Sequence, residues 1–272
     1  TRPLKVADEA GVPHWNPVLF RAPDEEQISL FYKVGHRITK WQTKVIRSDD
    51  DGYTWTDPSE LVPGDTGGRG PAKNKPIVLA DGTWAAPASI ERAHSWDAYA
   101  DLSYDRGRTW RHSRLVPLDH DTFPGKGVIQ SALWESAPGV VHMLLRSTCG
   151  WVCRSDSRDG GRTWSPAAPT SLPNNNSGLD LTRLADGPLV CVHNPVGVSW
   201  GPRTPLVAAI SADNGDSWQD WVTLEGEPGG EGELSYPAVV AEGDGVLCTY
   251  TWRRRGIALA RVAPKAPAAA GS

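Results

Sequence analysis

Basic side chains stand at similar places in successive segments of this chain of 272 residues. A guanidinium group can bind a carboxylate through two parallel hydrogen bonds, and an ammonium group adds a positive charge. Since the net charge of the chain is −4, several cations at one cavity would be a local exception. They predict a pocket for an anionic sugar, either a sialic acid or a uronic acid. The residues concerned are Lys33, Lys75, Arg146, Arg203 and Arg253.

Amide, imidazole and aromatic side chains accompany these cations in unusual loop sequences. The loop sequences are HWNP at 14–17, KNKP at 73–76, NNNSG at 174–178 and HNP at 193–195. Amides can hydrogen-bond sugar hydroxyls, and aromatic rings can stack on the apolar face of a sugar. We therefore predict that His14, Asn16 and Asn176 contribute to carbohydrate binding.

One eight-residue pattern, Ser-x-Asp-x-Gly-x-Thr/Ser-Trp, indicates the elements that position these side chains. Its four copies begin at Ser48, Ser103, Ser157 and Ser211, which are 55, 54 and 54 residues apart. A period of this length suits the four-stranded blades of a β-propeller. The Asp of each copy can accept hydrogen bonds from a turn, the Gly supplies a positive φ, and the Trp can bury its ring between blades. We expect the copies to be structural and not catalytic.

The order of strands within a period predicts where the polar residues lie. In the third period the strands are expected at 128–134, 140–146, 151–157 and from Thr163 onward, so the pattern falls between the third and fourth strands. Because the chain reverses at every strand, the heads of inner strands and the far ends of second strands share the face opposite the pattern. The heads are Asn16, Lys75, Gln130, Asn176 and Tyr236; the far ends are Lys33, Glu91, Arg146, His193 and Arg253; Arg203 precedes a third strand on the same face.

Five inner strands imply five blades. The last blade, 236–262, has no copy of the pattern and lacks its own outer strand, which residues 3–7 could supply to close the ring. We predict a single β-propeller domain over residues 1–262. The Ala- and Pro-rich residues 263–272 are predicted to be a disordered tail.

The composition excludes several classes of partner. The chain holds 13 Trp, 28 Gly and 23 Pro but one Met, as expected for short strands joined by tight turns. It has no basic footprint for nucleic acid and no apolar run of the roughly 20 residues that span a bilayer. We expect a carbohydrate substrate, no nucleic acid or membrane partner, and a monomer. Without a charged, apolar signal segment at its start, the chain is expected to be cytoplasmic, or secreted and already processed.

Four cysteines do not make a disulfide framework in a chain of this length. Cys191 and Cys248 lie in apolar runs that suit buried thiols. Cys149 and Cys153 could form a bridge or bind a metal, but no second pair has zinc-site spacing. We therefore expect no metal and no cofactor.

The four copies of the pattern resemble the Asp boxes, or BNR repeats, of the sialidase (neuraminidase) superfamily, and the resemblance covers nearly the whole chain. Sialidases bind the substrate carboxylate with three arginines and use a tyrosine nucleophile, a glutamate that activates it and an aspartate as acid/base. By this resemblance Arg146 is similar to the second arginine, Arg203 to the third, and Tyr236 to the nucleophile. Gln130 stands where the activating glutamate is expected, and an amide cannot act as a base.

The same resemblance implies a ring of six blades. Residues 4–7 then look like the last strand of a first blade, and that blade would carry the first arginine and the aspartate. Glu91 could replace one carboxylate because of its place in the predicted pocket.

Three functions remain open at this point. The first is a sialidase-like glycoside hydrolase acting on an anionic glycan, with Tyr236 as nucleophile, Arg146 and Arg203 as carboxylate clamps and Glu91 as acid. The second is a lyase or hydrolase of uronate polysaccharides, with His14 or His193 as base. The third is a glycan-binding propeller without catalysis.

Overall fold

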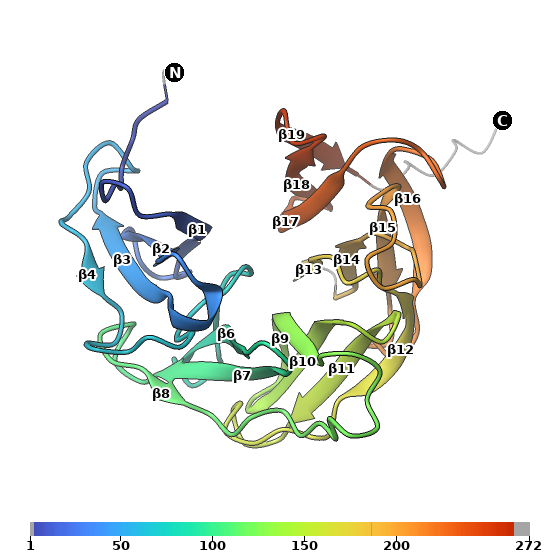
Figure 1. The fold of residues 1–272 in the computed structure, drawn as a ribbon, viewed down its shortest axis with the longest axis horizontal. Helices are drawn as coiled ribbons and strands as arrows, with labels where there is room; N and C mark the ends of the chain where they lie inside the picture. Colours follow the sequence, from blue (N-terminus) through green and yellow to red (C-terminus); the bar gives the residue numbers. More distant parts are fainter. Residues whose placement is uncertain (1–2, 186, 264–272) are drawn as a thin grey trace, which may run out of the picture. The chain divides into compact units, whose positions relative to one another are not determined.

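The structure is a computed structural model that describes residues 3–185 and 187–263. Within these residues the chain is all-β, with one 3-10 turn, η1 (Ile38–Lys40), and five antiparallel sheets (Figure 1). Consecutive strands pair in chain order within each sheet, which is the arrangement of a propeller blade. Four sheets have four strands and the fifth has three.

The first sheet contains β1 (His14–Arg21), β2 (Ile28–Val34), β3 (Gln42–Ser48) and β4 (Ser59–Glu60). The second contains β5 (Ile77–Val78), β6 (Trp84–Glu91), β7 (Trp96–Ser103) and β8 (Arg111–His112). The third contains β9 (Val128–Ala137), β10 (Val140–Ser147), β11 (Trp151–Ser157) and β12 (Ala168–Pro173). The fourth contains β13 (Asp180–Arg183), β14 (Leu189–His193), β15 (Leu206–Ser211) and β16 (Gln219–Glu225). The fifth contains β17 (Leu234–Glu242), β18 (Gly245–Trp252) and β19 (Gly256–Val262).

The chain divides into two compact units. The first unit comprises the described residues up to Cys149 together with Cys153–Pro169. The second comprises Gly150–Val152 and the described residues from Thr170. Each unit has its own core, so each holds a set of the predicted site residues in place.

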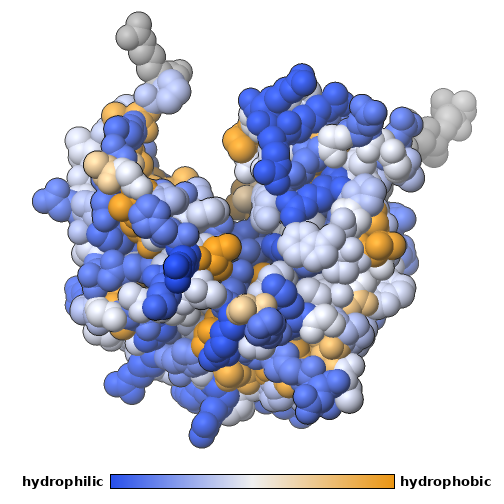
Figure 2. Space-filling view, viewed as in Figure 1, coloured by the Kyte–Doolittle hydropathy of each residue, from blue (hydrophilic) through white to orange (hydrophobic). Residues whose placement is uncertain are grey.

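Apolar side chains of neighbouring sheets form the cores. In the first unit, Phe31 of the first sheet packs with Trp84 and Trp110 of the second, and Leu102 packs with Leu145 of the third. In the second unit a cluster joins the fourth and fifth sheets, formed by Val190, Val192, Leu206, Val239, Val246 and Tyr250. Each fully buried aliphatic side chain stabilises the fold by about 1.5–3 kcal/mol. Figure 2 accordingly shows a viewed surface that is mostly hydrophilic, with hydrophobic residues in small separate areas.

The four Asp boxes form the predicted turns between third and fourth strands. In the third box the Ser157 hydroxyl donates to Asp159 at 2.8 Å, and the amide and hydroxyl of Thr163 donate to the same carboxylate at 2.9 and 2.7 Å. Gly161 adopts a φ of 80°, and the indole N–H of Trp164 donates to the Ser113 hydroxyl at 3.2 Å. The hydrogen bonds of Asp50, Asp105 and Asp213 follow the same plan. The boxes are therefore structural, as predicted.

Two predicted strands differ from the structure. The outer strand of the third sheet begins at Ala168 and not near Thr163, because Ser165 is engaged with Ser155 and Asp156 and the following Pro166 has no N–H for a ladder. Residues 3–7 form no strand, and Val6 and Ala7 instead pack against the first sheet. The fifth sheet thus has only β17–β19 among the described residues.

The predicted tail lies, apart from Ala263, outside the described residues, and its disorder stays a prediction. No helix in the described parts of the chain is long and apolar enough to cross a membrane.

Candidate functional site

A β-bulge lies at the head of three inner strands, and each bulge carries a predicted site residue. In each case two residues oppose a single residue of the second strand, which shifts the strand register at Asn16, Gln130 and Tyr236. Their φ angles are 48°, 51° and 52°. Bulges of this kind usually place glycine at this position, and bulges near active sites redirect a side chain. Other residue types held there are strained in a way that is typical of functional sites.

Asn176 has the same backbone feature in the fourth sheet, with a φ of 60° just ahead of β13. Four of the five residues predicted at strand heads therefore share a conformation that is uncommon outside glycine. The fifth, Lys75, is half-buried ahead of β5.

Arg146 and Gln130 are paired in the first unit. The Arg146 guanidinium donates to the Gln130 side-chain oxygen at 2.8 Å, and it lies 5.7 Å from the centre of the Trp96 ring. Both polar side chains are buried. Arg146 is thus positioned beside a neutral amide and an aromatic ring.

Glu91 ends β6 and lies within the electrostatic range of Arg146. Burial raises the pKa of Glu91 above its ordinary value, although the charges of Arg146 and Lys33 oppose the shift. Glu91 also lines a cleft of about 310 Å³, together with Asp65, Arg69 and other residues of the first unit. A carboxylic acid that keeps its proton at higher pH, beside a cleft, suits a proton donor.

Lys33 does not face this cleft. Its ammonium is completely buried and donates to the Thr43 hydroxyl at 2.7 Å and to the Arg69 carbonyl at 2.5 Å. Burial lowers the pKa of Lys33 to about 7, although neighbouring carboxylates oppose the shift. Lys33 was predicted to contact a substrate, but its ammonium group is buried in the structure. Its position along the strand did not indicate how deeply the side chain is buried.

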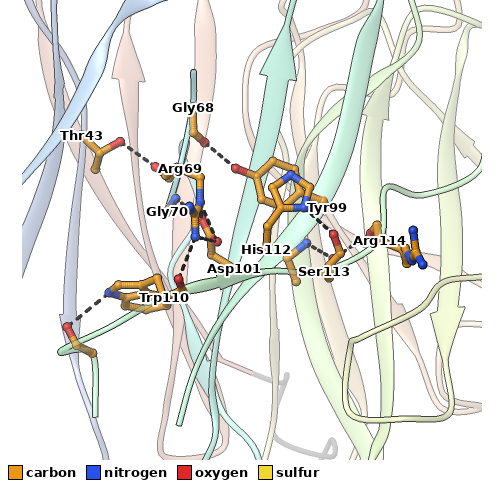
Figure 3. A network of polar contacts seen from close by, with 12 residues as sticks. Thr43, Gly68, Arg69, Gly70, Tyr99, Asp101, Trp110, His112, Ser113 and Arg114 are labelled. Carbon is orange, nitrogen blue, oxygen red and sulfur yellow. Dashed lines mark hydrogen bonds and ion pairs between the residues drawn. The ribbon is translucent and has the colours of Figure 1, made fainter. Parts of the chain in front are cut away.

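Sequence reasoning missed the group that covers Lys33. Arg69 binds the fully buried Asp101 through two of its nitrogens, at 2.7 to 3.0 Å, and donates to the Trp110 carbonyl at 2.9 Å (Figure 3). Gly68 and Gly70 flank Arg69. Position 68 has no room for a side chain, because a Cβ on Gly68 would lie 2.3 Å from the Ser89 carbonyl oxygen. The sequence GGRGP at 67–71 was the available signal. This segment links the first and second sheets beside the cleft.

Arg203 and Tyr236 come together in the second unit. The Arg203 guanidinium lies 5.0 Å from the centre of the Tyr236 ring, and Tyr236 is 37% exposed. Sequence reasoning missed the third member, Glu233, which accepts hydrogen bonds from Arg203 at 2.7 Å and from Arg254 at 2.5 Å. Burial opposes ionisation of Glu233, but hydrogen bonds from Ser235 and both arginines outweigh it and lower its pKa. A cation is therefore fixed directly beside an accessible phenol.

Amide side chains hold this cluster together. Asn194 donates to the carbonyls of Pro205 and Leu234, at 2.8 and 2.9 Å, which joins the segment after Arg203 to the strand that carries Tyr236. Asn175 donates to the Pro202 carbonyl at 2.6 Å. Asn175 and Asn194 thus support the backbone, and the part of Asn176 in sugar binding stays a prediction.

His193 is buried beneath the same loop. One ring nitrogen, Nδ1, lies 3.2 Å from the Pro173 carbonyl, while Nε2 has no hydrogen-bond partner among the described residues. Burial lowers the pKa of His193 to about 4, so the ring is neutral at pH 7. Its strand position is as predicted, but a buried ring is not placed to touch a polysaccharide.

Two other predicted residues are exposed. His14 stacks on Tyr32 with ring centres 5.5 Å apart, and Arg253 lies 5.3 Å from the centre of the Trp252 ring. The described residues include no group of three or more His, Cys, Asp or Glu side chains that could hold a metal ion. None of the four cysteines forms a disulfide, and the sulfurs of Cys149 and Cys153 lie 3.7 Å apart.

Comparison with known proteins places the chain in a family. A family profile described as a BNR repeat-like domain matches residues 1–248. This chain belongs to the BNR repeat-like family. The four Asp boxes are therefore its BNR repeats.

Sialidases are among the relatives of this BNR-repeat protein. A sialidase of Clostridium perfringens is 27% identical over 150 residues, which cover 49% of this chain and 36% of that enzyme. The chain thus matches about a third of the length of this curated relative.

Solved structures show the same fold at low identity. A protein of unknown function from Dyadobacter fermentans matches with a TM-score of 0.71 at 16% identity, over 98% of this chain and 77% of that one. Trypanosoma rangeli sialidase matches with a TM-score of 0.67 at 14% identity, over 89% and 42%. The NanB sialidase of Streptococcus pneumoniae matches with a TM-score of 0.59 at 17% identity, over 84% and 35%. The predicted all-β, sialidase-like β-propeller fold is confirmed.

Proposed function

We propose that this BNR-repeat protein is a glycoside hydrolase of the sialidase type that acts on an anionic glycan. The observation that carries the proposal is the cluster of Arg203, Tyr236 and Glu233 in the second unit. It places an accessible phenol beside a guanidinium group that is already oriented by a carboxylate. The family and the fold support a glycan-related function, and the cluster supports the finer reaction.

The chemistry of this cluster suits a sugar that carries its own carboxylate. Such a substrate repels a carboxylate nucleophile, whereas a phenol approaches it with less negative charge. In the proposed reaction the Tyr236 oxygen loses its proton to solvent water and forms a bond to the anomeric carbon, while the bond to the leaving oxygen breaks and Glu91 gives that oxygen a proton. Water then displaces the tyrosine and releases the sugar, and the proton that this water loses returns to Glu91. A solved structure of Trypanosoma rangeli sialidase with 2,3-difluorosialic acid is described as a covalent intermediate, which agrees with this two-step route for that enzyme.

Arg203 and Arg146 are proposed to bind substrate carboxylate groups. A guanidinium group matches the geometry of a carboxylate, and both arginines are oriented by neighbouring side chains. Asn16, Lys75, Asn176, Arg253 and His14 stay predicted contributors to substrate binding.

Glu91 is the proposed proton donor to the leaving oxygen. Its raised pKa keeps it protonated at higher pH than an ordinary glutamate, and a general acid must hold a proton at the working pH. Glu91→Gln should therefore reduce turnover most for substrates with poor leaving groups. A substrate with a good leaving group needs less protonation and should lose less.

The pairing of Gln130 with Arg146 favours a second candidate function, glycan binding without turnover. An amide can orient Arg146 but cannot accept a proton as the activating glutamate of sialidases does. The proposed hydrolase must therefore activate Tyr236 without Gln130. The buried position of His193 gives less support to the histidine-based reaction on uronates.

Hydrolysis of fluorogenic substrates tests the proposal. The purified chain is incubated with 4-methylumbelliferyl α-sialoside and with 4-methylumbelliferyl glucuronide. Tyr236→Phe should lower turnover on the order of 10⁴-fold, because only the nucleophilic oxygen is removed. Tyr53→Phe is the matched control, since Tyr53 is an exposed residue of the first Asp box.

Two outcomes contradict hydrolysis by Tyr236. One is the absence of fluorescence release from both substrates, and the other is equal turnover by wild type and Tyr236→Phe. Calorimetric binding of a sialylated or uronate oligosaccharide that is lost in Arg203→Ala, without any turnover, would establish the binding function instead.

A further inference from the structure

A cationic groove lies at the outer edge of the second sheet, within the first unit. It consists of two adjoining clefts of about 460 and 600 Å³, which share His112, Ser113, Arg114 and Thr163. Arg111 and Arg162 also line it. Among the described residues that line the two clefts, three are arginines and none is acidic. Asp81 and Asp159 interact electrostatically with Arg162 but line neither cleft, so arginines are the charged groups that face the groove.

Tyr104 provides an aromatic surface between two of these arginines. Tyr104 is 50% exposed, and the Arg111 guanidinium lies 6.0 Å from the centre of its ring. Arg162 lines the same cleft as Tyr104. Tyr104 thus lies beside an arginine and remains accessible.

A buried framework supports the groove. The Arg114 amide donates to the Arg162 carbonyl at 2.9 Å, so the segment after β8 is tied to the third Asp box. The hydroxyl of the buried Ser113 accepts hydrogen bonds from the Ala100 amide at 3.0 Å and the Trp164 indole at 3.2 Å. Figure 3 shows His112, Ser113 and Arg114 in succession, with the His112 ring beside that of Tyr99. These two rings are stacked, with their centres 3.6 Å apart. The arginines therefore extend from rigid backbone.

We propose that this groove is a second carbohydrate site, which binds a segment of an acidic polysaccharide. Arg111, Arg114 and Arg162 bind carboxylate groups, and a sugar ring stacks on Tyr104. Planar guanidinium groups match carboxylates, and aromatic rings complement the apolar face of a sugar. The net negative charge of the chain disfavours a densely charged polyanion such as nucleic acid, which requires many phosphate contacts.

The groove is independent of the proposed reaction, since neither Tyr236 nor Arg203 lines it. Only the class of ligand rests on the proposed function. Binding is therefore measured in the Tyr236→Phe variant, in which hydrolysis does not complicate the result. A failure of the hydrolysis experiment would leave this binding unchanged.

Affinity electrophoresis through gels that contain polygalacturonate or polysialic acid tests the proposal. The Tyr236→Phe protein should be retarded, and addition of Arg111→Ser, Arg114→Ser and Arg162→Ser should weaken binding by at least about 10-fold, a loss equivalent to roughly 1.4 kcal/mol. Tyr104→Ala should weaken binding without any change of charge. The matched control replaces Lys5, Arg106 and Arg255 by serine, which removes the same charge from other exposed positions.

Three outcomes overturn the proposal. Equal weakening by the control triple variant would show a general effect of charge. Absence of retardation by both acidic polysaccharides would show that the groove does not bind them. Tighter binding of single-stranded DNA, lost in the same triple variant, would assign the groove to nucleic acid. Thermal unfolding by circular dichroism verifies that each variant is folded.

Discussion

At the scale of single residues, Lys33 shows how depth changes the role of a charge. Its folded pKa of about 7 lies below the usual value of 10.5. Between these two values the unfolded chain binds a proton that the folded chain does not, so stability rises with pH across this window. The contribution of one such group reaches about 1.4 kcal/mol per pH unit.

The test compares wild type with Lys33→Met by urea denaturation at pH 7, 8, 9 and 10. The wild type should gain stability with pH relative to the variant. The Arg69 carbonyl keeps a donor in the variant, because the Thr43 hydroxyl also reaches it at 2.6 Å. Parallel stability curves for the two proteins would show instead that folded Lys33 keeps its proton up to pH 10.

The positions of site residues along their strands could be predicted from the sequence, but their depth could not. The spacing of the repeats placed Glu91, Gln130 and Arg146 together, and the structure brings these three close to one another. Lys33 and His193 occupy the predicted places at the ends of second strands, yet both are buried. The burial of a side chain depends on which neighbouring loops cover it, and the sequences of those loops are not repeated from blade to blade.

At the scale of elements, the segment around Arg69 connects β4 to β5 without regular secondary structure. Gly68 has a φ of 103°, and a Cβ there would lie 2.3 Å from the Ser89 carbonyl oxygen. Gly64 has a φ of 77°, but a Cβ there would meet nothing within 4 Å. Both glycines thus carry the cost of a positive φ, and only Gly68 adds a close approach.

We expect Gly68→Ala to be less stable than Gly64→Ala by about 1–3 kcal/mol, the usual cost of forcing extra volume into a packed site. Urea denaturation of both variants measures the difference. Equal free energies of unfolding would mean that the segment moves away from β6 without cost.

The Asp boxes could be predicted because their hydrogen bonds are local. Every donor to the Asp159 carboxylate lies within four residues of it. Arg69 and Asp101 are instead 32 residues apart, and no local pattern links them. The Asp-box turns can therefore be predicted from the sequence, whereas long-range contacts such as the Arg69–Asp101 ion pair cannot.

At the scale of the whole molecule, the box tryptophans stabilise contacts between blades to different degrees. Trp110 is 7% exposed and meets Phe31 of the preceding blade edge to face, with ring centres 6.1 Å apart. Trp55 of the first box is only half-buried. The same motif therefore makes unequal contributions.

Trp110→Ala should lower the free energy of unfolding by about 3–5 kcal/mol, as for other buried aromatic residues. Trp55→Ala should lower the free energy of unfolding clearly less, because the half-buried Trp55 ring loses less buried surface when it is removed. Denaturation curves of the two variants provide the comparison, and a larger loss for Trp55→Ala would contradict this view of the blade contacts.

The bulges at the strand heads have a consequence for how such proteins diversify. Each bulge residue lies outside the regular hydrogen-bond ladder of its sheet. Its side chain therefore does not belong to the alternating set of side chains that packs the core. Asn16, Gln130 and Tyr236 occupy equivalent positions with quite different chemistry. The box tryptophans, in contrast, are the same in all four copies. The molecule thus keeps the positions that maintain its architecture apart from those that select its reactivity, and exchange among the latter can create a new specificity on an unchanged scaffold.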